Sequence, residues 1–550
     1  MSRMTQQKNI NCEIFGSMVS CVLKYKDDIL LLMLSTLLLS FPSALENGEI
    51  AEIAFVTSFF HSLAWSILIL WVVSDYKYLK RIYFLFLFFL FFLDTSIYFL
   101  FGSRLDSNIV TLIMQTDFEE SKEFFISYLM TWKSLVCLIL FICMGGGILY
   151  WTDSRSLRNV LGKWFFRLLA VFFITIGLSL PFFVSVGNNT VAGIYKAYVY
   201  VINQHSDIEI LEESIDRITI FKDSCEKNPP TIVFVLGESH NKHHSQLYGY
   251  KLPTSPKLTL ESNLVVFTHA QSPVCYTAPA MRYIFSLKNC RTKNDTLLQY
   301  VLFPAIFKKA SFKVAYFDNQ FTRSKSGAED LGCNYFFSPK YINENCFDIR
   351  NNVMEKYDGD FIENNKTQFI KGGKALNIIH LKGQHIKAYK RYPNSFSIFK
   401  ADDVKRSDLT YSEREIVAEY DNATLYNDYV IYKIIDIFRN EDAVLVYLSD
   451  HGDNIYDGKM HRYGRRPAEL YDKESLYNIR QIPFMIWCSD SFILKRPYLY
   501  ERIKKQANKP VCSDDIAYCL FELAGIHSNF QNSSRSIISS TYQPHISKIE

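Results

Sequence analysis

The sequence carries little net charge for its length, and it has no long apolar run after about Val186. Its 60 basic and 56 acidic side chains leave a formal charge of +4 over 550 residues, so the composition gives no support to a nucleic-acid-binding function. The mean hydropathy is close to zero, which suits neither a purely soluble enzyme nor a compact transporter. This average hides a division, because long runs rich in Phe and Leu precede Val186 and an ordinary globular composition follows it. We therefore predict at least two structural units.

The N-terminal part contains five apolar segments of the membrane-spanning type. A bilayer core about 30 Å thick is crossed by ~20 mostly apolar helical residues. The segments run from about Ile29 to Leu45, Ile53 to Val73, Ile82 to Phe101, Leu135 to Trp151 and Trp164 to Val186. A cleavable signal peptide is a poor alternative, because the first apolar run begins late and four more follow it. The sequence predicts a five-helix transmembrane domain over residues 1–186.

The distribution of Lys and Arg predicts which side of the membrane each loop faces. The N-terminal segment and the loops after the second and fourth predicted helices are basic, whereas the loop after the first has Glu46 and Glu49 and no base. Five crossings from a cytoplasmic N-terminus place everything after Val186 outside. Eight of the 12 cysteines lie in that part, which suits an oxidising compartment. In a Gram-negative cell, we expect a multi-pass inner-membrane protein with a periplasmic domain.

Residues 187–228 have the composition of a polar connector, and residues 229–550 that of an α/β domain. Continuous apolar runs typical of strands buried on both faces of a parallel sheet occur at Ile232–Leu236, Ala375–Leu381, Ala443–Leu448 and Ile482–Trp487. Helical patterns such as YDNATLYNDYVIYKIIDIFRN lie between them. Strands that alternate with helices predict an α/β sandwich with a mostly parallel sheet.

Ionisable and polar side chains follow three of these predicted strands. They are Glu238 and Ser239 after the first, His380 and His385 after the second, and Asp450, His451, Asp453 and His461 after the third. In parallel sheets, ligands bind beyond the C-terminal ends of the strands. Carboxylates and imidazoles that converge there suit Zn²⁺, which accepts oxygen and nitrogen ligands. The sequence therefore predicts a zinc site.

The next candidate residue is a side chain that would act as a nucleophile beside this metal. Thr277 lies in SPVCYTAPAMRY, where a turn bounded by Pro and Cys precedes a plausible helix. The N-terminus of a helix offers backbone N–H groups to a phosphate. Taken alone, however, the segment is more typical of an ordinary threonine cap.

Five segments together carry a family resemblance. They are VLGESHNKHHSQLYGYKLPTSP, CYTAPAM, YDGDFI, HLKGQHIKAYKRYP and LSDHGDNIYDGKMHRYG. With the five apolar segments, they resemble the phosphoethanolamine transferases that modify Gram-negative lipopolysaccharide, within the alkaline phosphatase/sulfatase superfamily. The stretches LYGY, YDGD, KRYP and SDHGDNIYD are nearer to the branch that decorates core heptose than to the lipid A branch. The resemblance covers nearly the whole chain.

The resemblance implies both an activity and a set of roles. It implies a monomeric enzyme with one zinc ion or two, which moves phosphoethanolamine from phosphatidylethanolamine to lipid A or a core sugar of lipopolysaccharide through a phosphoethanolamine-threonine intermediate. The implied zinc ligands are Glu238, Thr277, Asp450 and His451, with Thr277 as the nucleophile. His385 and His461 match histidines that assist at the phosphate or hold a second metal.

The donor-binding residues are implied by the same resemblance. MQTDFEES, after the third predicted helix, resembles the lipid-substrate segment of the family, so Thr116 and Glu120 are candidates for contacting the donor head group. Leu112 stands where the family often has Asn, which departs from the pattern. His380 is a further candidate for substrate binding.

Two groups of residues depart from the family pattern or differ between its branches. The loop after the first predicted strand contains His240, His243 and His244, which we expect to be solvated, with an extra metal site as the alternative. The cysteines allow a Cys275–Cys290 disulfide and a weaker Cys333–Cys346 pair, whereas Cys512 and Cys519 are expected to be free thiols. Sequence alone leaves the connectivity open.

Three other functions remain as alternatives. A lipid-dependent phosphoglycerol transferase has the same general layout. A sulfatase needs a C/S-x-P-x-R segment, and CYTAPAMR does not fit that pattern. A non-catalytic envelope sensor, which would bind lipid or metal, is separated from an enzyme by its ligand set, and all four expected ligand types are present here.

Overall fold

The structure is a computed structural model of the chain. It describes residues 26–41, 50–73, 76–101, 208–291, 298–320, 335–459, 461–464 and 473–545, together with short pieces between 139 and 171. The chain divides into two compact units, residues 1–203 and 204–550, and each is described by itself. The division falls inside the segment that we expect to be a connector.

The first unit contains three described helices, α2 (Lys26–Ser40), α3 (Ile50–Val73) and α4 (Lys77–Phe101). They overlap the first three predicted crossings, and they pack on one another through apolar side chains such as Leu70 and Phe84. Within the described residues, the stretch 78–98 of α4 is the one helix that is long and apolar enough to cross a membrane. The fourth and fifth predicted segments lie almost entirely outside the described residues.

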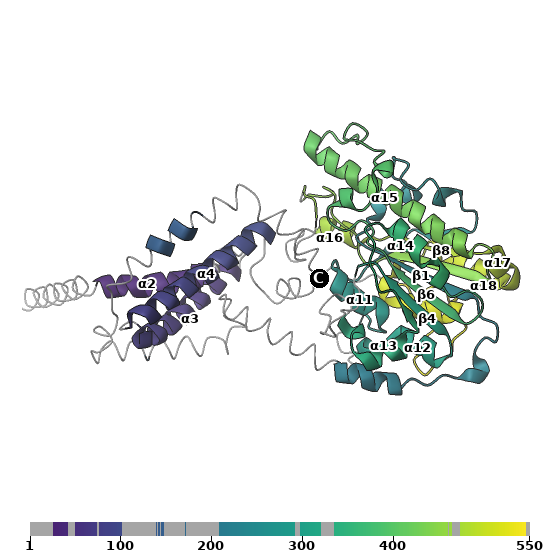
Figure 1. The fold of residues 1–550 in the computed structure, drawn as a ribbon, viewed down its shortest axis with the longest axis horizontal. Coiled ribbons are helices and arrows are strands. Elements are labelled where there is room, and N and C mark those ends of the chain that lie inside the picture. The colour runs from purple at the N-terminus through teal and green to yellow at the C-terminus, as the bar shows by residue number, and fades with distance from the viewer. Residues whose placement is uncertain are drawn as a thin grey trace, which may run out of the picture. The chain divides into compact units, whose positions relative to one another are not determined.

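The second unit is built on a seven-stranded sheet with the order β2-β8-β7-β1-β6-β4-β5. Figure 1 labels its strands β8, β1, β6 and β4. The strands are β1 (Thr231–Gly237), β2 (Leu264–Phe267), β4 (Lys313–Asp318), β5 (Ile349–Arg350), β6 (Ala375–His380), β7 (Ala443–Ser449) and β8 (Phe484–Cys488). The five strands β7, β1, β6, β4 and β5 are parallel, whereas β8 runs antiparallel to β7 and β2 antiparallel to β8. The predicted mostly parallel sheet is therefore confirmed.

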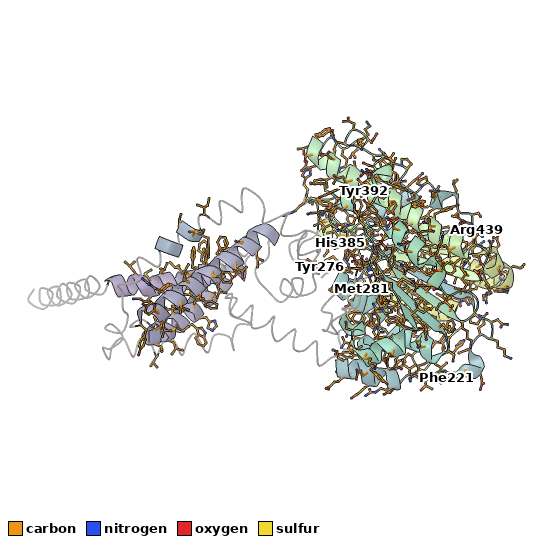
Figure 2. All side chains as sticks on the ribbon, viewed as in Figure 1. Phe221, Tyr276, Met281, His385, Tyr392 and Arg439 are labelled. Atoms are coloured by element: carbon orange, nitrogen blue, oxygen red, sulfur yellow. The ribbon has the colours of Figure 1, made fainter. Side chains whose placement is uncertain are left out.

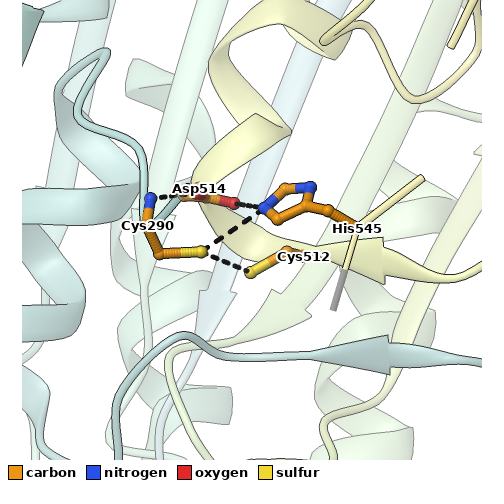
Figure 3. A group of neighbouring side chains, drawn as sticks. All are labelled: Cys290, Cys512, Asp514 and His545. Atoms are coloured by element: carbon orange, nitrogen blue, oxygen red, sulfur yellow. Dashed lines mark hydrogen bonds and ion pairs between the residues drawn. The ribbon is translucent and has the colours of Figure 1, made fainter. Parts of the chain in front are cut away.

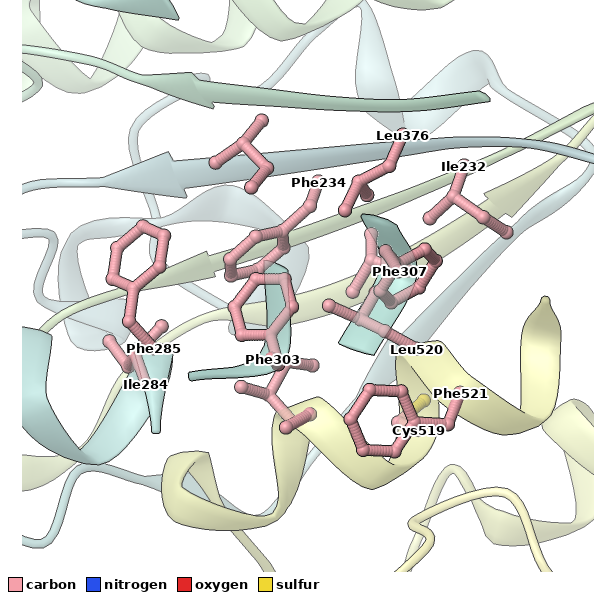
Figure 4. Packing of buried hydrophobic residues seen from close by; sticks show 14 of the residues in the cluster. Ile232, Phe234, Ile284, Phe285, Phe303, Phe307, Leu376, Cys519, Leu520 and Phe521 are labelled. Atoms are coloured by element: carbon pink, nitrogen blue, oxygen red, sulfur yellow. The ribbon is translucent and has the colours of Figure 1, made fainter. Parts of the chain in front are cut away.

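Helices cover both faces of this sheet, because strand residues alternate between two apolar cores. Ile232 and Phe234 of β1 belong to different faces from Val233 and Val235. Figure 4 shows Phe234 packed with Phe303 and Phe307 in the first core. Residues 208–216 of the second unit are helical. The labelled helices that follow them are α11 (Thr277–Phe285), α12 (Phe303–Lys309), α13 (Lys340–Cys346), α14 (Asp358–Asn365), α15 (Tyr411–Phe438), α16 (Lys473–Arg480), α17 (Asp490–Lys495), α18 (Pro497–Gln506) and α19 (Ile516–Leu523). A separate pair of short strands, β3 (Ala270–Gln271) and β9 (Val511–Cys512), lies outside the main sheet.

The register of the central strands determines where the functional side chains emerge. Gly237 of β1 pairs with Ser449 of β7, and Leu236 pairs with His380 of β6. The residues that directly follow β1 and β7 therefore leave the sheet side by side at its C-terminal edge.

Candidate active site

Three buried ligand-type side chains converge at the ends of β1 and β7. One ligand atom from each of Glu238, Asp450 and His451 lies within 4.8 Å of the others. Nε2 of His451 is 2.9 Å from Oδ2 of Asp450 and 3.6 Å from Oε1 of Glu238. All three residues have no exposed surface. The sequence-based expectation that these strand ends meet is confirmed by this geometry.

Thr277 completes the group from a different element. It is the first residue of α11, whose N-cap is Tyr276; Figure 2 labels Tyr276, with His385 at the same end of the unit. The Thr277 hydroxyl donates toward the Glu238 carboxylate, at 3.2 and 3.3 Å, and lies 3.1 Å from Nε2 of His451. The hydroxyl is thus directed at the cluster rather than used as a helix cap.

The orientation of the His451 ring determines which of its nitrogens faces this cluster. Its Nδ1 is 2.7 Å from the carbonyl oxygen of Gly452, and a carbonyl only accepts, so the hydrogen is on Nδ1. Nε2 faces the two carboxylates and the Thr277 hydroxyl, so it is the ring nitrogen available to a metal ion. Two carboxylates held this close repel each other, and a cation between them offsets that repulsion. Two carboxylates, one imidazole and one hydroxyl are a donor set that fits Zn²⁺.

Backbone and hydroxyl groups hold the two carboxylates in place. Oδ1 of Asp450 accepts from the backbone N–H groups of Ser239, at 3.0 Å, and His451, at 2.7 Å. The Ser239 hydroxyl donates to Oε1 of Glu238 at 2.6 Å. Ser239 has a φ of 56°, a strained conformation for a residue with a side chain. Ser239 keeps this conformation because its backbone N–H bonds Asp450 and its hydroxyl bonds Glu238.

Gln320, His380 and Asp318 form a buried hydrogen-bonded group that contacts Glu238. Of these residues, the sequence indicated only His380. The Gln320 side-chain amide donates to Oε2 of Glu238 at 3.2 Å and contacts Nε2 of His380 at 2.9 Å. Nδ1 of His380 is 3.0 Å from Oδ1 of Asp318. Burial by itself disfavours the charged imidazole, but the charges of Asp318, Glu238 and Asp450 raise the pKa of His380. His380 is therefore buried, and Gln320 connects it to Glu238.

The other predicted site residues lie elsewhere. His385 is half-buried in the loop after β6, with its Nδ1 3.4 Å from Nη2 of Arg391. His461 is 45% exposed, and its Nε2 is 3.5 Å from Glu413. Neither belongs to the clustered ligand atoms, so their roles at a phosphate stay predictions. Thr116 and Glu120 lie outside the described residues.

The expectation of a solvated histidine loop is wrong for two of its three members. His240 and His244 are each 3% exposed, whereas His243 is exposed. Nδ1 of His240 contacts the Tyr447 hydroxyl at 2.8 Å, and burial lowers the pKa of His240 to about 3. Nδ1 of His244 is 2.7 Å from Oδ1 of Asp421. These side chains are internal because Tyr447 of β7 and Asp421 of α15 bond their Nδ1 atoms.

The ion pair between His244 and Asp421 predicts a pH dependence of stability. Burial disfavours the imidazolium, but Asp421 and Asp457 raise the pKa of His244 to about 10; Tyr250 also bonds Asp421, and neutral His240 lies nearby. Because this folded-state pKa exceeds the ordinary value of 6.5, the pair stabilises fully below pH 6.5, and its contribution falls as the pH rises to about 10. We expect His244→Gln to remove this component from the unfolding free energy measured by urea titration across that range. An unchanged pH profile in the variant would contradict the assignment.

The turn after β6 predicts a second testable effect. Gly383 has a φ of 49°, and a Cβ there would lie 2.7 and 2.8 Å from the backbone oxygen and nitrogen of Glu238. We expect Gly383→Ala to displace Glu238 and slow turnover on the order of 10²-fold, as a misplacement by about 1 Å does.

Gly372 provides the matched control for this variant. It has a φ of 79° with open space around its Cβ position, so Gly372→Ala should cost about 1 kcal/mol of stability and keep the rate. Equal rate losses in the two alanine variants would show that backbone strain, not contact with Glu238, is responsible.

The predicted Cys275–Cys290 disulfide is not formed. Both residues are free thiols. Cys275 is buried against Leu476 and Ile479, while Sγ of Cys290 lies 3.9 Å from Sγ of Cys512. Cys512 and Cys519 are free, as expected, and Cys333 lies outside the described residues.

The fold and the site together define a class of protein. Residues 230–526 match the sulfatase family model, so the chain belongs to the sulfatase family. The phosphoethanolamine transferase resemblance is confirmed within that family. The chain is 24% identical to "Phosphoethanolamine transferase EptC" of Escherichia coli K12 over 481 residues, which is 81% of this chain and 80% of that protein. It is 25% identical to "Phosphoethanolamine transferase EptA" of Helicobacter pylori over 419 residues, which is 73% and 74% of the two chains.

Solved structures agree on the fold. The integral membrane protein lipooligosaccharide phosphoethanolamine transferase A of Neisseria meningitidis covers 93% of this chain and 98% of its own, with 17% identity and a TM-score of 0.62. The C-terminal periplasmic domain of the E. coli EptC protein, solved in complex with Zn, covers 60% of this chain and 90% of its own, with 24% identity and a TM-score of 0.51.

Proposed function

We propose that this chain transfers phosphoethanolamine from phosphatidylethanolamine to lipopolysaccharide, with Thr277 as the residue that carries the group. One observation carries the proposal. The Thr277 hydroxyl, at the start of α11, lies within 3.3 Å of both Glu238 and His451 in a buried set of acceptors. The names of the relatives support the same activity.

The residues of the site suit a two-step transfer. The Glu238 carboxylate accepts the Thr277 hydrogen bond and so directs its proton away from the phosphorus, leaving an oxygen lone pair for attack. The first backbone N–H groups of α11 have no partner within the helix and suit a phosphate oxygen. When bound, zinc would lower the pKa of a coordinated hydroxyl and offset charge on the phosphoryl oxygens.

The bond changes balance over the two steps. Thr277 Oγ bonds to phosphorus, the bond to the diacylglycerol oxygen breaks, and diacylglycerol leaves with a proton. An acceptor hydroxyl or phosphate then attacks the same phosphorus and releases Thr277 with its proton restored. We keep His385 and His461 as candidate proton donors for these steps, since both follow strands of the same sheet edge.

The first unit would serve a lipid donor. We infer a five-helix membrane domain at residues 1–186, a connector at 187–228 and a catalytic domain at 229–550 on the periplasmic side. The basic loops and the apolar helix α4 support this arrangement. A donor that is itself a lipid requires catalysis next to the membrane surface.

Mass spectrometry of lipopolysaccharide tests the activity and its acceptor. Cells that express the chain should gain one phosphoethanolamine unit relative to cells that express Thr277→Ala at an equal level. Fragmentation then assigns the unit to a lipid A phosphate, a core heptose or another envelope glycan. Identical lipopolysaccharide in the two strains would contradict the proposed function.

A further inference from the structure

A second cluster of metal-ligand side chains lies in the same unit as the active site and shares no residue with it. Cys290, Cys512, Asp514 and His545 each offer one ligand atom, and these atoms lie within 4.8 Å of one another (Figure 3). They come from the segment after α11, from β9 and the turn that follows it, and from near the C-terminus. The two central members, Cys512 and Asp514, are fully buried.

Three distances within the cluster match those around a tetrahedral zinc ion. Zinc bonds of about 2.3 Å to sulfur and about 2.0–2.1 Å to nitrogen and oxygen place two sulfurs about 3.8 Å apart, sulfur and nitrogen about 3.5 Å apart, and nitrogen and oxygen about 3.3 Å apart. The observed separations are 3.9 Å for the Cys290 and Cys512 sulfurs, 3.4 Å for Cys290 Sγ to His545 Nε2, and 3.1 Å for His545 Nε2 to Asp514 Oδ1. Each agrees within about 0.2 Å.

Outer contacts orient these ligands in the way that metal ligands require. Nδ1 of His545 lies at an ion-pair distance of 3.2 Å from Oδ2 of Asp515, while Nε2 faces Cys290 and Asp514. Asp515 is itself held by Arg535, at 2.6 Å, and Arg291, at 2.9 Å. The second oxygen of Asp514 accepts the backbone N–H of Cys290 at 2.8 Å. Asp514 and His545 therefore each have a supporting partner.

The charges and the ligand types also favour a metal over a disulfide. Two thiolates and one carboxylate around Zn²⁺ leave one negative charge, and the Arg535 guanidinium lies 4.0 Å from Asp514. A disulfide needs its sulfurs about 2.05 Å apart, and it would give Asp514 and His545 no part. Four protein ligands close the coordination sphere, which is typical of structural rather than catalytic zinc.

We propose that Cys290, Cys512, Asp514 and His545 form a structural zinc site. The site joins the segment that leaves the nucleophile helix α11 to β9 and to the C-terminal end of the chain. It stabilises the position of α11, and it takes no part in the transfer reaction.

Cobalt substitution of the full-length protein in detergent tests this site separately from the active site. After chelation, added Co²⁺ should produce a sulfur-to-cobalt charge-transfer band, which the active-site cluster, having no thiolate, cannot give. Cys290→Ser, Cys512→Ser and His545→Gln should each lose this band at equimolar cobalt. Cys275→Ser, which removes the buried thiol two residues before Thr277, should keep it.

Thiol mapping of the wild-type protein decides the matter even if a variant does not fold. Alkylation of unreduced, denatured protein should modify both Cys290 and Cys512. A Cys290–Cys512 disulfide in that map, or a wild-type protein with no thiolate–cobalt band, would overturn the proposal.

Discussion

Replacing Thr277 by Ala is expected to abolish transfer while the protein stays folded and inserted in the membrane. The change removes the one oxygen that lies 3.2 Å from Glu238 and 3.1 Å from His451, and no methyl group can bond to phosphorus in its place. We expect the rate to fall on the order of 10⁴-fold or more, as losses of catalytic nucleophiles do. Release of diacylglycerol from vesicles that contain phosphatidylethanolamine measures this rate.

A serine at the same position is the control for this experiment. Thr277→Ser keeps the hydroxyl and loses only a methyl group from a half-buried position, so it should retain measurable transfer. Equal thermal stability of the Ala and Ser variants would show that the difference is chemical. Transfer by Thr277→Ala at the wild-type rate would remove Thr277 as the nucleophile.

Replacing Asp450 by Asn is expected to release the catalytic metal and with it the activity. Asp450 contributes one of the two buried carboxylates, and its Oδ2 lies 2.9 Å from Nε2 of His451. The amide removes that charge, so we expect zinc affinity to fall by at least 10- to 100-fold, a loss that even outer-shell changes cause. Metal analysis after dialysis against a weak chelator measures the zinc retained.

Asp453→Asn is the matched control, because Asp453 is a buried carboxylate of the same loop that lies outside the clustered ligand atoms. This variant should keep the catalytic zinc. Zinc bound at the proposed site of Cys290, Cys512, Asp514 and His545 should not respond to either change. The two variants are therefore compared by the difference between their zinc contents. Equal zinc contents in both variants would argue against Asp450 as a ligand.

Sequence reasoning located the core of the fold because three central strands are buried on both faces. The runs that became β1, β6 and β7 consist of buried residues throughout, and this pattern is distinctive in sequence. The strand β8 was also found, but its antiparallel direction has no signature in composition. The two-residue strand β5 is too short to produce any pattern.

The clustered carboxylates of the candidate site could be located for the same reason, whereas their supporting residues could not. Glu238 and Asp450 directly follow apolar runs, so the strand ends identify them. Asp318 ends a similar run, KVAYFD, and this signal could have identified it. Gln320 is different, because an amide is recognisable as a support for Glu238 only when the distance is known.

Contacts between distant segments account for the remaining errors. His244 is internal because Asp421, 177 residues away, bonds its Nδ1. Cys290 meets Cys512 over a separation of 222 residues, so its nearer neighbour in sequence, Cys275, was the wrong partner. Such pairings depend on how β9 and the segment after α11 come together, which periodicity does not describe.

Tandem mass spectrometry of the peptide that contains Thr277 tests the central claim most directly. The full-length protein is mixed with phosphatidylethanolamine in the absence of lipopolysaccharide, quenched and digested. A phosphoethanolamine ester on the Thr277 hydroxyl, which disappears when lipopolysaccharide is added, is the predicted result. An adduct on another side chain, or transfer to lipopolysaccharide by protein that never carries the group on Thr277, would contradict it.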